Sequence, residues 1–249
     1  MKKTIIFCLL WSLCVTINAQ KTFALITGVS NYEGEVNDLH QSTKDAKNIA
    51  NLYKNKGAHV TILTSKYATR EKIIETIQKI AKAARPSDHV VFSYSGHGMP
   101  NILCTYSENG SQMLSYSDLF TELDKCKAKD VVCYIDACYA GTAAFNMHSK
   151  DSSDDSWKQI MKNNPRYILF LSSRSDELSR EGRLVGAGLF TRALLNGLRG
   201  KCDVNQDKNI TTKELFTYIY KDVQLHSNKK QHPQLVTSSS LHDTILMTW

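Results

Sequence analysis

The sequence has no apolar run long enough to cross a membrane as a helix, which takes about 20 consecutive residues. The nearest candidate, Ile5–Ile17, is shorter, follows two lysines and precedes a small residue, Ala19. This pattern is typical of a secretory signal peptide. We therefore expect removal of residues 1–19 and export to a periplasmic or extracellular location, without stable membrane insertion. An uncleaved anchor is the alternative interpretation.

The sequence also lacks a basic stripe and internal repeats. Its formal net charge is +7, but the basic residues are scattered and Lys229-Lys230 is the only late pair. A scattered distribution does not predict a nucleic-acid partner. With 42% hydrophobic and 22% charged residues, the chain can bury one substantial core. We expect a single domain over residues 20–249.

The cysteines show no spacing that specifies disulfide pairs. Five remain after residue 19, and an odd number in an exported protein implies at least one free thiol. Four of them are expected to be small buried apolar residues, although pairing among them stays open: Cys104, Cys126, Cys133 and Cys202.

The fifth, Cys138, ends an apolar segment that begins at Val131 and has the composition of a buried strand. A second such segment, Val90–Ser95, runs into Ser-Gly-His-Gly, with His97 between the two glycines. The carboxyl ends of strands in an open α/β sheet are where ligands bind. A thiol and an imidazole there form the pair that a cysteine nucleophile needs. The two residues predict a catalytic site.

Strand-like and helical segments alternate along the whole chain. This order favours right-handed crossovers and a largely parallel sheet, and hence a three-layer α/β/α sandwich. The strands are expected at 22–29, 59–63, 90–95, 131–136, 167–172 and 243–249, with a hairpin near 102–106. The helices are expected at 39–56, 69–84, 115–126, 188–198 and 212–225.

Three motifs resemble the caspase-type cysteine peptidases, and the metacaspases and their bacterial relatives more than animal caspases. They are Ser-Gly-His-Gly, Asp-Ala-Cys-Tyr-Ala-Gly and Ser-Ser-Arg-Ser-Asp-Glu-Leu-Ser-Arg-Glu. Metacaspases carry aspartate two residues before the nucleophile, as Asp136 stands here, whereas animal caspases carry glutamine. The resemblance covers nearly all of residues 20–249 and implies a cysteine endopeptidase that needs no cofactor for its chemistry.

The resemblance also implies further site residues. Side chains alternate along a strand, so Asp136 is expected on the face of Cys138, and Ser95 on the face of His97. In metacaspases the positions of Asp45 and Ser42 belong to the same substrate pocket. Two carboxylates in one partly dry pocket require a cation, which predicts cleavage after Arg or Lys. The alternative for Asp45 is an ordinary solvated carboxylate.

The remaining implied roles concern the reacting carbonyl and the substrate backbone. The amides of Gly98 and Cys138 are expected to hold the oxyanion, glycine allowing close approach of the main chain. Ser172 and Ser173 end the next strand and are expected to form a rim that pairs with the substrate backbone, although they also suit a plain strand-to-loop turn.

A second motif lies near the end of the chain. Oxygen-bearing side chains occupy positions 1, 3, 5, 9 and 12 of an EF-hand-type calcium loop: Asp203, Asn205, Asp207, Thr211 and Glu214. Asn209 at position 7 offers its backbone carbonyl. Lys208 stands where that loop normally has glycine, and the chain has no second loop. The spacing predicts a Ca²⁺ site; the alternative is a polar turn that caps the following helix.

An acidic, serine-rich segment, residues 148–158, separates a part with the His/Cys pair (20–147) from a second part (159–249). Lys150 and Lys158 flank it, so a protease that cuts after basic residues would process itself there. The partners expected overall are peptides or proteins with basic residues. Two alternatives stay open: an inactive binding module with this fold, and a thiol amidase or transpeptidase of the cell envelope.

Overall fold

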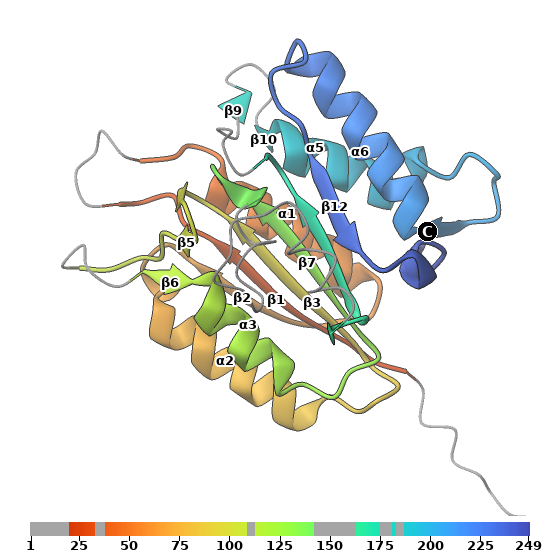
Figure 1. Cartoon of the computed structure of the whole chain (residues 1–249). Coiled ribbons are helices and arrows are strands. Elements are labelled where there is room, and N and C mark those ends of the chain that lie inside the picture. Colours follow the sequence, from red (N-terminus) through yellow and green to blue (C-terminus); the bar gives the residue numbers. More distant parts are fainter. Residues whose placement is uncertain (1–19, 33–37, 109–112, 142–162, 175–180, 183–186) are drawn as a thin grey trace, which may run out of the picture.

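A six-stranded sheet forms the centre of the computed structural model (Figure 1). The structure describes residues 20–32, 38–108, 113–141, 163–174, 181–182 and 187–249. The strand order is β12-β8-β7-β3-β1-β2. These strands span Thr22–Gly28 (β1), His59–Thr64 (β2), His89–Ser95 (β3), Asp130–Asp136 (β7), Tyr167–Leu171 (β8) and Gln234–Thr237 (β12).

Five of these strands are parallel, and β12 is antiparallel to β8 at one edge. The central strands β7 and β8 are buried along their full length, as their continuous apolar sequences predict. The register of β3 and β7 runs from His89 opposite Asp130 to Ser95 opposite Asp136. Both strands therefore end at the same level of the sheet.

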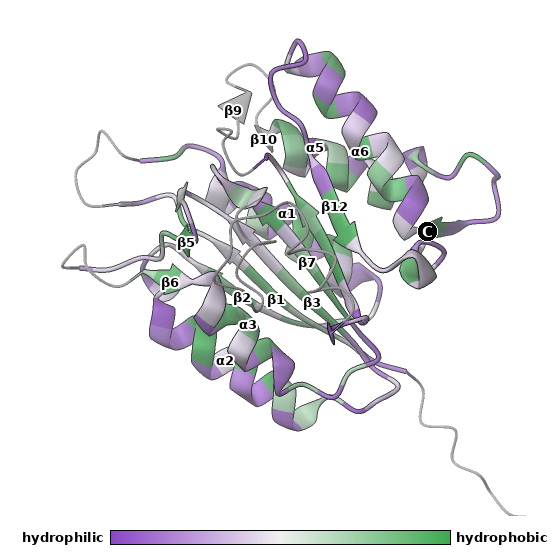
Figure 2. Cartoon of the chain, in the orientation of Figure 1, coloured by the Kyte–Doolittle hydropathy of each residue, from purple (hydrophilic) through white to green (hydrophobic). Residues whose placement is uncertain are grey.

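Helices cover both faces of the sheet. α2 (Arg70–Ala83) and α3 (Tyr116–Asp124) pack on one face, and α1 (Ser42–Asn55), α5 (Leu189–Asn196) and α6 (Thr212–His226) pack on the other (Figure 1). In α2, Ile73, Ile77 and Ile80 are buried at helical spacing, and the Thr69 side chain caps the first turn. Figure 2 shows hydrophobic strands between helices with hydrophilic outer faces. The predicted three-layer α/β/α class is confirmed.

The smaller elements differ from the expectation. The hairpin near 102–106 is a three-stranded sheet of β4 (Gly98–Met99), β5 (Ile102–Leu103) and β6 (Leu114–Ser115). The strand expected at 243–249 is β13 (Ile245–Thr248), which pairs with β11 (Asn209–Thr211) and not with the central sheet. The edge position that it leaves is filled by β12, a strand too short to stand out in the sequence. The other elements are β9 (Glu181–Gly182), β10 (Ala187–Gly188), and the short helices η2 (Ser65–Tyr67), η4 (Gly197–Lys201) and η5 (Ser239–Leu241).

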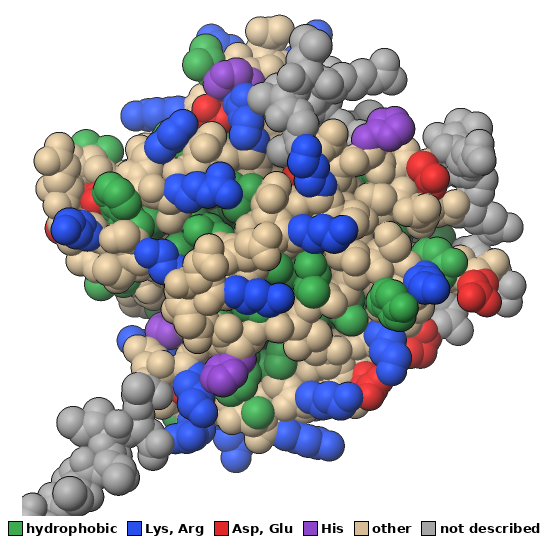
Figure 3. All heavy atoms as spheres, turned by 180° about the vertical axis from the view of Figure 1, so that it is seen from behind, with side chains coloured by type: hydrophobic (Ala, Val, Ile, Leu, Met, Phe, Trp, Pro, Cys, Tyr) green, Lys and Arg blue, Asp and Glu red, His purple; other side chains and the backbone are tan. Residues whose placement is uncertain are grey.

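The structure also shows how the basic residues and the cysteines are distributed. Lys and Arg side chains are spread over the face in Figure 3, interspersed with neutral and some acidic residues. Among the described residues, no helix is long and apolar enough to cross a membrane. All five cysteines beyond residue 19 are free thiols; Cys126, Cys133 and Cys202 are buried, and Cys104 and Cys138 are partly exposed.

Candidate active site

His97 and Cys138 lie at the carboxyl ends of neighbouring strands. Ser95 of β3 is paired with Asp136 of β7. His97 lies two positions after Ser95, and Cys138 lies two positions after Asp136, so the two residues leave the sheet at the same level. The Gly96 amide donates a hydrogen bond to the Asp136 carbonyl oxygen at 3.1 Å. The two segments stay in contact after the strands end, because a Cβ atom built on Gly98 would lie 2.4 Å from the Cys138 carbonyl oxygen.

That close approach explains why residue 98 is glycine. The sequence predicts that glycine lets the main chain approach the substrate. The nearest neighbour is instead the main chain of Cys138, and any larger side chain would push the two segments apart. The predicted oxyanion role of the Gly98 and Cys138 amides stays a prediction.

Two tyrosines hold the main chain of His97. The Tyr32 hydroxyl oxygen accepts a 2.7 Å hydrogen bond from the His97 amide, and the two rings lie 4.5 Å apart between centroids. The Tyr94 hydroxyl donates to the His97 carbonyl oxygen at 2.8 Å. Burial, with smaller effects of nearby thiols, raises the pKa of Tyr32 well above its usual range, so its phenol stays protonated. The sequence analysis missed Tyr32 and Tyr94, because their contacts with the main chain of His97 exist only in the folded protein.

Two serines hold the turn that carries Cys138. The Ser172 hydroxyl accepts from the Ala137 amide at 3.2 Å and lies 3.0 Å from the Ala137 carbonyl oxygen, to which it donates. The Ser173 hydroxyl accepts from the Ala140 amide at 3.3 Å. Both serines are fully buried. Their hydroxyls therefore fix the turn, and the predicted contact with a substrate backbone stays a prediction.

The carboxylates of Asp45 and Asp136 converge at the start of α5. Gly188 donates its amide hydrogen to Asp45 Oδ2 at 3.2 Å. Thr191 donates to Asp136 Oδ2 from its amide at 3.2 Å and from its hydroxyl at 2.8 Å. A Cβ on Gly188 would lie 2.8 Å from Asp136 Oδ2 and 3.5 Å from Asp45 Oδ2. Amides at a helix N-terminus favour negative charge, which explains why two carboxylates are tolerated there.

The burial of these side chains decides between the two interpretations of Asp45. Asp45 is 1% exposed and Asp136 is 9% exposed, so Asp45 is not a solvated helix carboxylate. Ser42 lies almost one helical turn before Asp45 and is 3% exposed; Ser95, opposite Asp136 in the sheet, is 4% exposed. The structure thus brings the predicted pocket residues to one edge of the sheet. Their contact with substrate stays a prediction.

A second thiol, Cys104, lies close to this edge. Its amide donates to the His97 carbonyl oxygen at 3.0 Å. Burial raises the pKa of the Cys104 thiol to about 11, and the nearby Cys138 acts in the same direction. Cys104 is therefore protonated at neutral pH and is a poor nucleophile.

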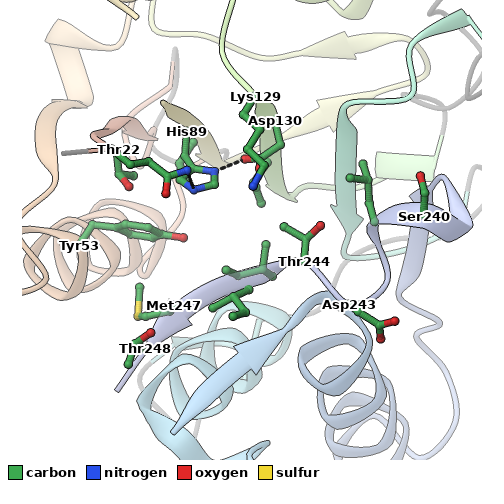
Figure 4. A pocket seen from close by; sticks show the side chains of 16 residues that line it. Thr22, Tyr53, His89, Lys129, Asp130, Ser240, Asp243, Thr244, Met247 and Thr248 are labelled. Atoms are coloured by element: carbon green, nitrogen blue, oxygen red, sulfur yellow. Dashed lines mark hydrogen bonds and ion pairs between the residues drawn. The ribbon is translucent and has the colours of Figure 1, made fainter. Parts of the chain in front are cut away.

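A cavity of about 710 Å³ opens at the opposite edge of the sheet (Figure 4). Residues at the start of β1, β3 and β7, among them His89 and Asp130, form one wall, and residues 240, 241 and 243–248 form the other. His89 Nδ1 lies 2.6 Å from Asp130 Oδ1. One strand length, about 20 Å, separates this cavity from His97. Since open parallel sheets bind ligands at their carboxyl ends, we assign the candidate active site to the edge with His97 and Cys138.

No group of three or more His, Cys, Asp or Glu side chains in the described part of the chain is arranged to hold a metal ion. The predicted calcium ligands Asp203, Asp207 and Glu214 are therefore not assembled as a metal site, and Glu214 caps α6 instead. Lys150 and Lys158, the predicted processing positions, lie outside the described residues, as do residues 1–19 of the predicted signal peptide.

Known proteins resemble this chain in sequence and in fold. The family model of the caspase domain matches residues 21–245. Metacaspase-1 of Meyerozyma guilliermondii is 30% identical over 149 residues, which cover 48% of this chain and 35% of that protein. Metacaspase-1 of Scheffersomyces stipitis is 33% identical over 119 residues, which cover 44% of this chain and 28% of that protein. The chain thus spans about a third or less of the length of these relatives.

The fold has a counterpart among solved structures. The crystal structure of protein GSU0716 from Geobacter sulfurreducens superposes with a TM-score of 0.63 at 20% identity. The superposition covers 92% of this chain and 98% of that protein. At this identity the likeness shows a shared fold.

Proposed function

Because the chain belongs to the caspase-domain family of cysteine peptidases, we propose that it is an active endopeptidase with Cys138 as nucleophile and His97 as general acid and base. The observation that carries the proposal is the matched end of β3 and β7, where the main chain of Gly98 contacts that of Cys138. A nucleophile and its base must lie within hydrogen-bond reach, and adjacent strand ends in register support the proposal that His97 and Cys138 form such a pair.

The proposed reaction has two steps. The His97 imidazole takes the thiol proton, the Cys138 sulfur bonds to the carbonyl carbon, and the proton passes to the leaving amine as the peptide bond breaks. A water molecule then attacks the thioester, gives its proton to His97, and the thiol re-forms as the acid product leaves. The amides of Gly98 and Cys138 are proposed to stabilise the oxyanion in both steps.

The proposed substrate preference is for Arg or Lys on the amino side of the cut. Asp45 and Asp136 present two buried carboxylates that meet at Gly188. The α5 N-terminus offsets part of their repulsion, and a guanidinium or ammonium group would offset the rest while forming charge-assisted hydrogen bonds. An acidic substrate side chain would add a third negative charge and be rejected. Ser42 and Ser95 are proposed to line the same pocket.

A library of fluorogenic peptides varied at the residue before the cut tests chemistry and preference together. We expect cleavage after Arg and Lys, and none by Cys138→Ala protein. Asp136→Asn should lower kcat/KM on these peptides at least about 30-fold, since it removes one partner of a buried charge pair. Asp130→Asn is the matched control, a buried carboxylate on the same strand at the opposite edge. A preference for acidic residues would refute the proposed pocket.

An arginyl acyloxymethyl ketone, which alkylates active thiols, distinguishes this function from the two alternatives. A peptidase is labelled at Cys138, whereas an inactive binding module is not. A thiol amidase or transpeptidase of the cell envelope would be labelled poorly by this peptide probe and would turn over peptidoglycan fragments in place of peptides.

Export and self-processing complete the proposal. An N-terminus at Gln20 in protein recovered outside the cytoplasm supports cleavage of a signal peptide after Ala19; intact residues 1–19 there would contradict it. Self-processing after Lys150 or Lys158 predicts fragments from the wild type. Purified Cys138→Ala protein should stay whole, and its spontaneous nicking at these lysines would contradict self-cleavage.

A further inference from the structure

We propose that residues 203–214 form a calcium site of the EF-hand type, separate from the candidate active site. The loop follows η4 and leads through β11 directly into α6. Its sequence supplies the oxygen donors at the spacing of a calcium loop. The structure adds three observations that the spacing alone does not contain, and they concern Lys208, Asp203 and β13.

Lys208 adopts the backbone conformation for which calcium loops normally use glycine. Its φ is +65°, in the left-handed region, and its side chain is exposed. The Lys208 amide donates to Asp203 Oδ2 at 2.9 Å, which closes the turn between loop positions 1 and 6. In the sequence, Lys208 counted against a calcium loop, because glycine normally makes the sharp turn at this position. The turn forms with lysine in place, and the remaining cost is one positive charge near the metal.

Asp203 offers a buried carboxylate oxygen to a cation. The side chain is 9% exposed, and Oδ2 accepts hydrogen bonds from the Lys208 amide and from Trp249 Nε1, both at 2.9 Å. The other oxygen, Oδ1, is buried and has no hydrogen-bond partner within the described part of the chain. The main-chain amides of Gln206 and Asp207 also act on this carboxylate and favour its charged form. Leaving a buried charged acceptor without a full set of partners is costly, and a cation bound in the loop would supply the missing partner of Oδ1.

The remaining donors surround the same turn. Asp207 and Asn205 are exposed side chains held by the loop main chain: Asp207 Oδ1 accepts from the Asn209 amide at 2.7 Å, and Asn205 Oδ1 accepts from the Asp207 amide at 3.0 Å. Glu214 Oε2 accepts from the Thr211 amide at 3.0 Å in a capping box that starts α6. Glu214 Oε1 is outside that box and supplies the last ligand when its side chain turns toward the metal.

The C-terminal strand supports the loop from outside. Ile210 of β11 is fully buried and pairs with Met247 of antiparallel β13. The Trp249 amide donates to the Lys208 carbonyl oxygen at 3.0 Å. The chain has no second calcium loop to pair with this one. β13 takes that place, because it pairs antiparallel with β11 of the loop.

The ligand chemistry sets the expected affinity. All donors are oxygens, and their flexible spacing suits Ca²⁺ better than Mg²⁺, which demands a near-ideal octahedron and gives up water reluctantly. A loop that must turn Glu214 and that carries Lys208 belongs with the weaker calcium modules, whose Kd values are about 10⁻⁴–10⁻³ M.

Isothermal titration of the full chain with CaCl₂, and with MgCl₂ in parallel, tests the site without any substrate. We expect one calcium per chain, no comparable magnesium binding, and a melting temperature raised by about 3–5 °C at calcium ten times Kd. No heat and no thermal shift at 10-fold excess over about 10⁻³ M calcium, or an equal response to magnesium, would overturn the proposal.

Two variants and one control test where the ion binds. Asp207→Asn keeps the oxygen that accepts the Asn209 amide but loses the charge, and it should weaken binding about 10-fold. Lys208→Gly removes a nearby positive charge and should tighten binding roughly fivefold. Lys229→Gly is the matched control, an exposed lysine with φ +59° in another turn, and it should leave Kd unchanged. Unchanged Kd in both Asp207→Asn and Lys208→Gly would place the ion elsewhere and refute the site.

Discussion

The substitution Gly98→Ala tests whether the contact between the two strand ends is needed for activity. The added Cβ would lie 2.4 Å from the Cys138 carbonyl oxygen and 3.0 Å from the Ala137 Cβ. Ordinary C···O contacts begin near about 3.3 Å, so the two segments must separate by about 0.9 Å. Gly98 is not among the residues with positive φ, so alanine fits its backbone and the contact alone causes the effect.

The size of the loss follows from this displacement. A misplacement of about 1 Å between reacting groups costs about 100-fold in rate, so kcat/KM on an Arg or Lys peptide should fall about 100-fold. Overpacking of this kind also destabilises the fold by about 1–3 kcal/mol. Urea unfolding measures the free energy of unfolding, and assays well below the unfolding midpoint measure kcat/KM of folded protein.

Gly197→Ala is the matched control for Gly98→Ala. Its Cβ would come to 2.6 Å from a neighbouring atom, but that atom is the end of the flexible Leu215 side chain, far from the strand ends. We expect a loss of stability at most comparable to that of Gly98→Ala and unchanged kcat/KM. If Gly98→Ala keeps kcat/KM within threefold of the wild type, or if both variants lose activity equally, the proposed role of the contact is wrong.

Two further predictions concern the neighbours of the pair. Tyr32→Phe removes the acceptor of the partly buried His97 amide. An unsatisfied buried N–H costs about 1–3 kcal/mol, and the lower end of this range corresponds to a kcat/KM about 10-fold lower. Tyr53→Phe, which loses a buried hydroxyl contact elsewhere, should lower stability only, and equal kinetic effects of the two substitutions would count against a specific role of Tyr32. Since the pKa of Cys104 is raised to about 11, about one molecule in 1,000 carries its thiolate at pH 8. Iodoacetamide followed by peptide mass mapping should show Cys138 modified first, and labelling of Cys104 should increase about tenfold per pH unit up to about 11. Faster labelling of Cys104 than of Cys138 at pH 8 would contradict the raised pKa of Cys104.

The central strands and the residues at their carboxyl ends could be predicted from the sequence, because apolar runs and their ends are local features. The apolar runs that form β3, β7 and β8 are continuous, and their lengths match buried parallel strands. The residues at which these runs break, His97 and Cys138, are visible without knowing any partner. The spacing of the 203–214 loop is likewise a property of one short segment.

The weaker predictions failed where pairing is decided at long range. β13 carries an apolar pattern that suits the central sheet, but it pairs with β11, and β12 takes the sheet edge. Which edge a short strand joins depends on the length of the connections and on the side chains already packed there, and neither can be read from the strand itself.

The sequence by itself determined the fold class, the order of the elements and the positions of one imidazole and one thiol, because strand and helix periodicity and strand ends are encoded within a few residues. Only the tertiary structure decided that Asp45 is buried beside Asp136 at the α5 N-terminus, and that Tyr32 supports His97. These contacts join residues separated by 55 to 143 positions, and packing, not local sequence, selects them.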